Sequence, residues 1–307
     1  MYKKIILFAA LFFMLAGRAF ADEIIMDTSS GCKLSGQWTR SGQTGYGEQN
    51  VLRADGAENA EVLWNLSKPG VFRLYYWKTV DPENGASDTK LTVSSERTNR
   101  EFNADFSQGN AGWNEIGIAE SGGAGTKIIF AGGNGIIYAS AIKAETLGAE
   151  YSDLFSYNNR YKKNVLLLAD SKNAYVDGVR YKIDDAVPTI VGGTTFVPIR
   201  FVSEALGADV KWDTTKNIAA VSYNGKQMTF APNSAQCTID GEVHNFAQST
   251  FISNDRMMMP LRFISENMGK MVFWSDTGVI SITEGGMPDA QKDSKMINNI
   301  YRILKTE

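Results

Sequence analysis

Short runs of alternating apolar and polar residues, separated by turn residues, fill the first half of the chain. Strands that recur at roughly ten-residue spacing, with turn signals between them, are typical of antiparallel sandwiches. No helical periodicity interrupts them. The pattern therefore predicts one all-β sandwich domain over residues 22–147. Its expected strands lie at 60–66, 70–80, 88–96, 100–106, 112–120, 126–133 and 135–145.

A second pattern, written twice, fills residues 164–284. The segment TFVPIRFVSEALGADVKW (195–212) returns 62 residues later as MMMPLRFISENMGKMVFW (257–274), with eight of eighteen positions identical. In each copy an apolar stripe at helical spacing is followed by a short strand, and an Asp-Gly hairpin signal precedes the copy. Each copy is predicted as a short helix on a small antiparallel sheet, and two copies together bury what one would expose.

The identical positions have structural interpretations. The prolines suit the first helical position, and the glycines suit the residue after the helix, where φ is positive. The Arg and Glu stand four apart on one helix face, where they pair, with a ligand clamp as the alternative. The tryptophans are predicted to pack onto the helix. These residues are Pro198, Arg200, Glu204, Gly207 and Trp212 in the first copy and Pro260, Arg262, Glu266, Gly269 and Trp274 in the second.

Two segments lie outside these patterns. Residues 148–163 are polar and aromatic without alternation, which predicts a linker with at most one helical turn. Residues 285–307 are predicted to be a tail whose amphipathic helix, with Ile297, Ile300 and Leu304 on one face, packs on the repeats or leads to a partner segment. The predicted fold class is an all-β sandwich followed by an α+β domain made of two tandem repeats.

Residues 1–21 have the pattern of a secretory signal peptide. Lys3 and Lys4 precede an apolar run, and a small-x-small site (19–21) precedes Asp22. The run is too short to span a bilayer, and no later stretch is long enough. We therefore expect a secreted, extracellular and cell-wall-associated protein that begins at Asp22 and has no membrane span.

Charge and cysteine content restrict the partners further. Removal of three positive charges with the signal peptide takes the net charge from −3 to −6. This mildly acidic chain has no electrostatic footprint for nucleic acid. The two cysteines, Cys32 and Cys237, lie 205 positions apart. They are either isolated thiols or a bridge that ties the two halves of the chain together.

The repeat region resembles the copper amine oxidase N-terminal domain over about residues 164–283. The resemblance rests on the doubled Pro-x-Arg start, the Gly-to-Trp spacing and the Asp-Gly turns. It implies a stalk-like, non-catalytic α+β module common in secreted proteins of Gram-positive bacteria. The catalytic core of that family needs three imidazoles, whereas this chain has one histidine, His244.

The first domain is similar to golvesin-like or xanthan-lyase-type carbohydrate-binding sandwiches. The matching segments are AEVLWNLSKPGVFRLYYWKT (60–79), GWNEIGIAE (112–120) and IIYASAIKAE (136–145). Phe72 stands where the family usually has Tyr, and Ile116 where it has Leu. The resemblance implies a binding or structural module, with polysaccharide as the candidate ligand.

The residue inventory argues against catalysis and a resident metal. One histidine cannot complete a copper site, and its separation of seven residues from Cys237 does not establish a nucleophile pair. HExxH, P-loop and zinc-cysteine motifs are absent from the sequence. Paired carboxylates for glycoside cleavage stay open, because their separation depends on the fold. The acidic loop 81–88 could hold Ca²⁺ but lacks EF-hand spacing, so it is interpreted as solvated. We expect no catalytic residue, no cofactor and no metal.

The aromatic residues of the sandwich are the binding candidates. Trp64 and Trp77 lie in strongly apolar strands and are predicted to be core residues. Trp38, Tyr46 and Trp113 lie near polar, Gly-rich flanks, where an exposed ring can stack on a sugar, with core packing as the alternative.

The sequence thus indicates a non-catalytic binding or adhesion protein of the cell envelope. In this hypothesis the sandwich contacts a cell-wall or extracellular polysaccharide and the repeats act as a spacer. The alternative is a structural assembly protein that contacts protein partners through sheet edges or its C-terminal helix. A third option is an accessory subunit of a separate hydrolase.

Overall fold

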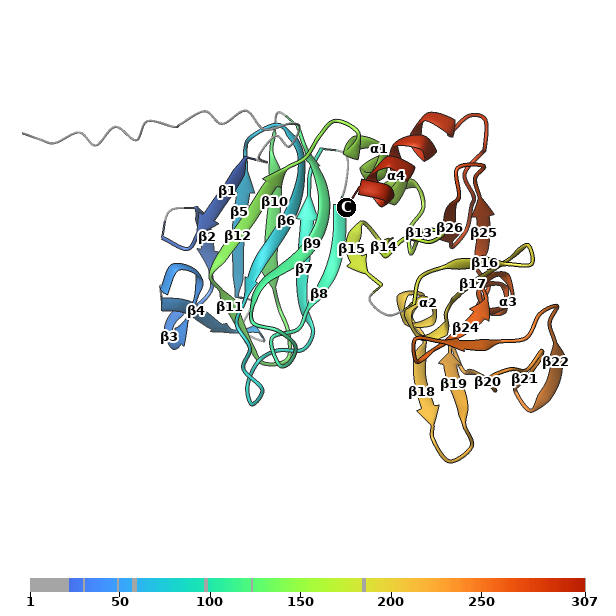
Figure 1. The fold of residues 1–307 in the computed structure, drawn as a ribbon. Coiled ribbons are helices and arrows are strands. Elements are labelled where there is room, and N and C mark those ends of the chain that lie inside the picture. The colour runs from blue at the N-terminus through green and yellow to red at the C-terminus, as the bar shows by residue number, and fades with distance from the viewer. Residues whose placement is uncertain are drawn as a thin grey trace, which may run out of the picture.

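The computed structural model describes residues 22–29, 31–48, 50–56, 60–96, 99–122, 124–183 and 186–306. The chain folds there into a β-sandwich and an α+β domain that lie side by side (Figure 1). The predicted fold class is therefore confirmed. The predicted signal peptide lies outside the described residues.

The sandwich consists of strands that pair antiparallel in the sheet orders β1-β12-β6-β9, β2-β5-β10-β7-β8 and β11-β4-β3. A short 3-10 helix, η1 (Tyr46–Glu48), precedes β4. The strands are β1 (Glu23–Asp27), β2 (Cys32–Ser35), β3 (Thr39–Thr44), β4 (Asn50–Asp55), β5 (Glu61–Leu66), β6 (Gly70–Lys78), β7 (Thr89–Ser94), β8 (Asn99–Ala104), β9 (Gly112–Ser121), β10 (Thr126–Ala131), β11 (Ile136–Ala139) and β12 (Ala141–Thr146).

One hydrophobic core fills the space between the sandwich sheets. Phe72, Leu74 and Tyr76 of β6 belong to it, and they alternate along the strand with residues that point outward. Trp64 of β5 is 1% exposed and packs edge-on against Phe130 of β10. The prediction that Trp64 is a core residue is therefore confirmed.

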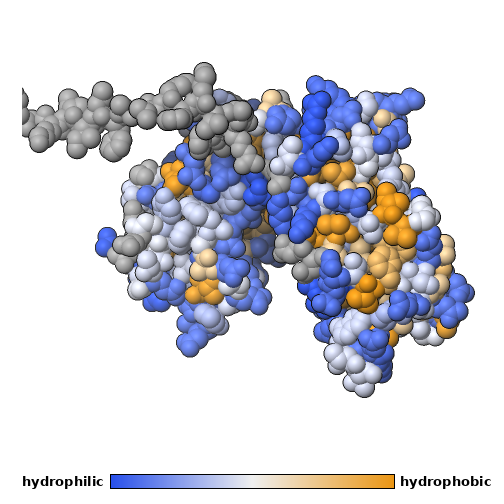
Figure 2. Space-filling model, viewed as in Figure 1, coloured by the Kyte–Doolittle hydropathy of each residue, from blue (hydrophilic) through white to orange (hydrophobic). Residues whose placement is uncertain are grey.

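The second domain contains the helices and the remaining strands. They are α1 (Tyr151–Arg160), β13 (Val165–Leu168), β14 (Asn173–Val176), β15 (Val179–Lys182), β16 (Thr189–Val191), β17 (Thr194–Pro198), α2 (Ile199–Ala205), β18 (Asp209–Asp213), β19 (Ile218–Tyr223), β20 (Lys226–Phe230), β21 (Gln236–Ile239), β22 (Glu242–Asn245), β23 (Phe251–Ser253), β24 (Arg256–Pro260), α3 (Leu261–Asn267), β25 (Met271–Trp274), β26 (Val279–Thr283) and α4 (Ser294–Thr306). Hydrophobic residues reach the visible surface mainly over this domain (Figure 2).

The two copies of the repeat interlock, because each outer sheet takes strands from both. The sheet β15-β14-β13-β26-β25 joins the start of the first copy to the end of the second, and β18-β19-β20-β21-β22 does the reverse. In the central sheet β16-β17-β24-β23, Val197 lies opposite Met259, 62 positions along the chain. This register relates the copies by a local two-fold axis that passes between β17 and β24.

The repeated helices form as predicted, with one shift at their start. Gly207 and Gly269 follow the C-cap residues with φ of 90° and 71°, the left-handed conformation expected after a helix. Pro198 and Pro260 are N-cap residues, so their predicted placement at the first helical position is wrong. Both prolines remain in the ladder between β17 and β24, which keeps them extended and moves the helix start one residue on.

The segment between the domains and the tail fold together. Residues 148–163, predicted as a linker with at most one helical turn, contain the ten-residue helix α1. This helix packs against α4, whose apolar face is buried with Ile297, Ile300 and Leu304. The tail helix therefore packs on the body of the protein. Val71 of the sandwich belongs to the same apolar cluster, which continues from one domain into the other.

Candidate functional site

Outward-facing residues of three neighbouring strands form a row across the sheet β1-β12-β6-β9. Arg73, Tyr75 and Trp77 alternate with the core residues of β6. Tyr75 lies opposite Lys143 of β12, and Trp77 lies opposite Trp113 of β9. The row therefore runs from a charged end at Arg73 to an aromatic end at Trp77.

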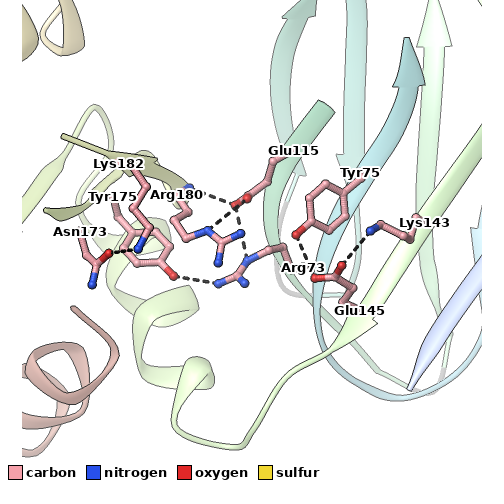
Figure 3. A network of polar contacts seen from close by, with 9 residues as sticks. All are labelled: Arg73, Tyr75, Glu115, Lys143, Glu145, Asn173, Tyr175, Arg180 and Lys182. Carbon is pink, nitrogen blue, oxygen red and sulfur yellow. Dashed lines mark hydrogen bonds and ion pairs between the residues drawn. The ribbon is translucent and has the colours of Figure 1, made fainter. Parts of the chain in front are cut away.

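The charged end of the row holds the two domains together (Figure 3). Arg73 is 4% exposed, and its Nη2 donates to the hydroxyl of Tyr175 in β14 at 2.9 Å. Its Nε lies 3.6 Å from Oε1 of Glu115, which also accepts the backbone N–H of Arg180 in β15 at 3.0 Å. This end of the sheet face is consequently occupied by the repeat domain.

The aromatic end is formed by Tyr46, Trp77 and Trp113, which we call the aromatic cluster. Their ring centroids are 5.7 Å (Tyr46–Trp77), 5.1 Å (Tyr46–Trp113) and 5.4 Å (Trp77–Trp113) apart. The three rings are half-buried and lie outside the core cluster of the sandwich. Two of the three predicted stacking residues, Tyr46 and Trp113, thus lie together.

Trp77 is the member of the aromatic cluster that sequence reasoning missed, and its predicted place in the core is wrong. Strand β6 carries large apolar residues on both faces, so hydrophobicity alone does not separate core from outer positions. The usable signal was the period of two, because Phe72, Leu74 and Tyr76 point inward and leave Trp77 on the outer face.

Charged side chains lie beside the aromatic cluster. The Lys143 ammonium is 4.3 Å from the ring centroid of Tyr75 and 5.5 Å from that of Trp113. The ammonium pairs with Glu145 at 2.8 Å, and the Tyr75 hydroxyl donates to Glu145 at 2.9 Å (Figure 3). Lys143 also pairs with Glu23 at 3.2 Å. The cluster therefore has a fixed cation and two carboxylates at its border.

Burial and hydrogen bonds shift the pKa values of Lys143 and Tyr75. Burial lowers the pKa of Lys143, but hydrogen bonds to Glu145 and Glu23 outweigh it and leave the pKa above its ordinary value. Burial raises the pKa of Tyr75, and the Glu115 charge and the hydrogen bond to Glu145 add to this effect. At neutral pH the ammonium stays charged and the phenol stays neutral, so neither exchanges a proton readily.

Trp38, the third predicted stacking residue, lies elsewhere. Its ring is half-buried and packs against the sandwich core, and its indole N–H donates to the Ser35 carbonyl at 2.9 Å. Among the described residues it has no ring contact with the aromatic cluster. The structure therefore separates Trp38 from the other two candidates.

The cysteines do not form reactive or bridged pairs. Both Cys32 and Cys237 are free thiols. Cys237 lies opposite His244 in the pairing of β21 with β22, but burial raises its pKa to about 11. The thiol is therefore protonated at neutral pH and is a poor nucleophile.

The described ranges contain neither a metal-binding cluster nor a helix that could span a membrane. No group of three or more His, Cys, Asp or Glu there could hold a metal ion. In the acidic loop 81–88, the Asp81 carboxylate accepts hydrogen bonds from the Tyr138 hydroxyl at 2.5 Å and from the backbone N–H of Asn84 at 3.2 Å. Among the helices of those same ranges, none is long and apolar enough to cross a membrane.

The helix pairs of the repeats form locally, as predicted. Arg200 lies 3.8 Å from Glu204, and Arg262 lies 3.3 Å from Glu266, all with exposed side chains. Their tryptophans differ. Trp274 packs against the core, whereas Trp212 is 37% exposed and lies outside that core cluster, so its packing onto the helix stays a prediction.

Comparison with known proteins agrees with the repeat pattern. Residues 162–282 match the sequence model of the copper amine oxidase N-terminal domain family. No curated protein matches the chain.

Several solved structures are similar over 41% of this chain. One is xanthan lyase from Paenibacillus, with 19% identity, a TM-score of 0.37 and 13% of its own length covered. Another is a family 35 carbohydrate-binding module from Clostridium thermocellum, with 14% identity, a TM-score of 0.30 and 100% covered. A third is a carbohydrate-binding module of lichenase 5A from Cellvibrio mixtus in complex with cellotriose, with 15% identity, a TM-score of 0.30 and 98% covered. The chain thus spans only a small part of the xanthan lyase.

Proposed function

We propose that this chain is an exported, non-catalytic binding protein of the cell envelope and that its aromatic cluster holds a glycan chain. The observation that carries the proposal is the position of Tyr46, Trp77 and Trp113 outside the core, half-exposed on an outer sheet face. Aromatic ring faces attract the C–H faces of sugar rings, and neighbouring polar groups orient the hydroxyls. Lys143 and its carboxylate partners supply those polar groups.

The ring orientations favour a single glycan chain over a flat crystalline surface. The interplanar angles are 68° for Tyr46–Trp77, 51° for Tyr46–Trp113 and 88° for Trp77–Trp113. Coplanar rings would suit a flat polysaccharide face, whereas tilted rings grip one chain from different sides. The proposed ligand is therefore a soluble or amorphous cell-wall or extracellular polysaccharide.

Binding assays with folded variants test this proposal. The mature chain would be pulled down on purified cell walls and insoluble glycans and run through gels that contain soluble polysaccharides. We expect Trp113→Ala and Trp77→Ala to weaken binding about tenfold or more. Trp38→Ala is the matched control, because Trp38 lies outside the aromatic cluster, and it should bind like wild type. Wild-type protein that binds none of these glycans would overturn the proposal.

Of the two surfaces suggested for contact with protein partners, the C-terminal helix is buried and a sheet edge is exposed. The apolar stripe of α4 is buried, so it is not exposed to a partner. The edge strand β22 is exposed along its length, and Val243 is 67% exposed, which suits strand pairing with a protein. Assembly would be favoured if an envelope protein copurifies with wild type and is lost in Val243→Lys, while glycan binding is absent.

Export is testable separately from binding. Asp22 follows the cleavage site proposed from the sequence. When the full-length gene product is expressed in a secreting bacterial host, we expect it in the medium or the wall fraction. Its mass should be that of a chain that begins at Asp22. An intracellular product that keeps its first residues would contradict the proposed location.

A further inference from the structure

Each copy of the repeat borders a groove in which its helix start and tryptophan strand meet a hairpin of the other copy. The first groove has a volume of about 490 Å³ and the second about 510 Å³. Seven lining positions correspond at the 62-residue spacing. They are Pro198, Arg200, Trp212, Ile252, Asp255, Arg256 and Met257 in the first groove and Pro260, Arg262, Trp274, Ile190, Gly193, Thr194 and Thr195 in the second.

In the second groove, the side chain of Trp274 has partners within the protein. The indole N–H of Trp274 donates to Oγ1 of Thr195 at 3.2 Å. The guanidinium of Arg262 lies 4.4 Å from the Trp274 ring centroid, within cation–π range. Both the polar atom and one ring face of Trp274 are therefore used within the protein.

In the first groove, the side chain of Trp212 lacks the partners that Trp274 has. The residue equivalent to Thr195 is Met257, which has no hydroxyl to accept the indole N–H. Within the part of the chain that the structure describes, the side chain of Trp212 makes no hydrogen bond, ring contact or cation–π contact, and the residue is 37% exposed. An exposed ring beside an unused N–H matches a ligand that offers an apolar face and an oxygen acceptor.

The charged side chains that line this groove are mainly cationic. Arg200, Lys211 and Arg256 line it, against one carboxylate, Asp255. The carboxylates that pair with Arg200 and Lys211 belong to Glu204 and Asp209, which lie outside the lining. Ion pairs this exposed are weak, so a ligand carboxylate in the groove can join them.

We propose that the first groove binds a saccharide that carries a carboxylate, such as a uronic acid residue of a polysaccharide. The sugar ring stacks on Trp212, a ring or hydroxyl oxygen accepts its indole N–H, and the carboxylate contacts Arg200, Lys211 or Arg256. The groove volume of about 490 Å³ lies within the usual size of small-molecule sites, about 300–1,000 Å³. This second site belongs to the repeat domain and does not depend on the aromatic cluster.

Fluorine NMR can observe the two sites separately in the whole mature chain. Labelling with 5-fluorotryptophan gives one resonance for each of the six tryptophans, which single Trp→Phe variants assign. Tetragalacturonate is the acidic probe, its fully methyl-esterified form is the neutral probe, and tetraglutamate is the peptide probe. We expect tetragalacturonate to shift the Trp212 resonance saturably and to leave that of Trp274 unchanged.

Variants and probes decide the outcome. The methyl ester and the double variant Lys211→Gln/Arg256→Gln should each bind about tenfold more weakly at Trp212. Trp113→Ala should leave the Trp212 response intact, so failure of the sandwich site and failure of this groove are distinguishable. The proposal is overturned if no saccharide shifts Trp212, if the methyl ester binds equally well, or if tetraglutamate replaces tetragalacturonate with equal affinity.

Discussion

The two halves of the repeat domain have the same local structure but different surroundings. The half that contains β13, β14, β15, β25 and β26 contacts the sandwich and carries α4. The half that contains β18 to β22 ends in β22, whose residues are all exposed. Similar sequences therefore produce similar elements, while the neighbours decide which side chains are buried.

The surroundings also change the chemistry of equivalent positions. Lys270 is 4% exposed, pairs with Glu284 at 2.7 Å, and lies 5.6 Å from the ring centroid of Tyr223. Its equivalent in the first copy is Ala208, which carries no charge. The second copy thus has a buried polar contact at a position where the first copy has an uncharged side chain.

Arg73→Ala should have the largest effect on stability, because Arg73 joins the sandwich to the half of the repeat domain that contains β13, β14 and β15. Loss of a buried partner leaves Glu115 without its nearest sandwich cation and should destabilise the protein by about 3–5 kcal/mol. Urea unfolding measures this change. The control is Glu242→Ala on β22, which should change stability by less than about 0.5 kcal/mol. Equal effects at both positions would refute the distinction.

Truncation of the two tryptophans should separate the copies next. Trp274→Ala removes a packed ring, its hydrogen bond to Thr195 and its contact with Arg262, at a cost of about 2–3 kcal/mol. Trp212→Ala removes a ring that is 37% exposed and has neither of these contacts, so it should cost less, about 1–2 kcal/mol. Thermal and urea unfolding of both variants compare the two costs. A larger loss for Trp212→Ala would show that the first groove is not open.

The Lys270–Glu284 pair predicts a pH dependence that the first copy lacks. Burial lowers the pKa of Lys270, but its hydrogen bonds to Glu284 and Tyr223 outweigh this and raise it above 10.5. The hydrogen bond from Lys270 and its charge lower the pKa of Glu284 below 4.5. The stabilisation is therefore present between these ordinary values, and is lost as pH falls through the lowered Glu284 pKa or rises through the raised Lys270 pKa.

Lys270→Met tests this pair. Because Glu284 is about half exposed, with a side-chain exposure of 48%, we expect a loss of only about 1 kcal/mol at pH 7. The difference from wild type should shrink at acidic pH and at strongly alkaline pH in urea unfolding. A difference that stays constant with pH would mean that packing of the side chain, and not its charge, is responsible.

The helix pairs should give the smallest effect. Arg200→Ala breaks an exposed pair and should cost about 0.3 kcal/mol. Arg262→Ala also removes the cation over Trp274, so it should cost about 1 kcal/mol. Both lie on the exposed faces of short helices, which makes them matched variants. Equal costs in urea unfolding would remove the role assigned to the cation–π contact.

The sequence predicted what depends on local pattern. Period-two alternation indicated the sandwich, and the Pro-to-Gly helix spacing indicated the repeats. The sequence did not predict how the two copies pair. A repeat shows that an element recurs, but it does not show which strands of one copy join a sheet of the other. Helix α1 was missed since its apolar side chains contact α4, more than a hundred positions later.

The aromatic cluster was only partly predictable for the same physical reason. Tyr46, Trp77 and Trp113 come from η1, β6 and β9, and only the register between β6 and β9 brings the two tryptophans opposite each other. Flanking residues identified two members. The third required knowledge of which face of β6 points outward, which a strand with large residues on both faces does not reveal.

The pairing of β13 with β26 closes the base of the repeat domain. Val165 lies opposite Ile282, and Leu168 lies opposite Val279, so the chain enters and leaves the domain at the same end of this ladder. A pulling force between α1 and the tail would act on one end of this ladder. It would break the hydrogen bonds one after another and would not load them all at once. The repeats would carry no tension until the ladder had opened. A force along the chain would therefore pass through the β13–β26 ladder and bypass the rest of the repeat domain.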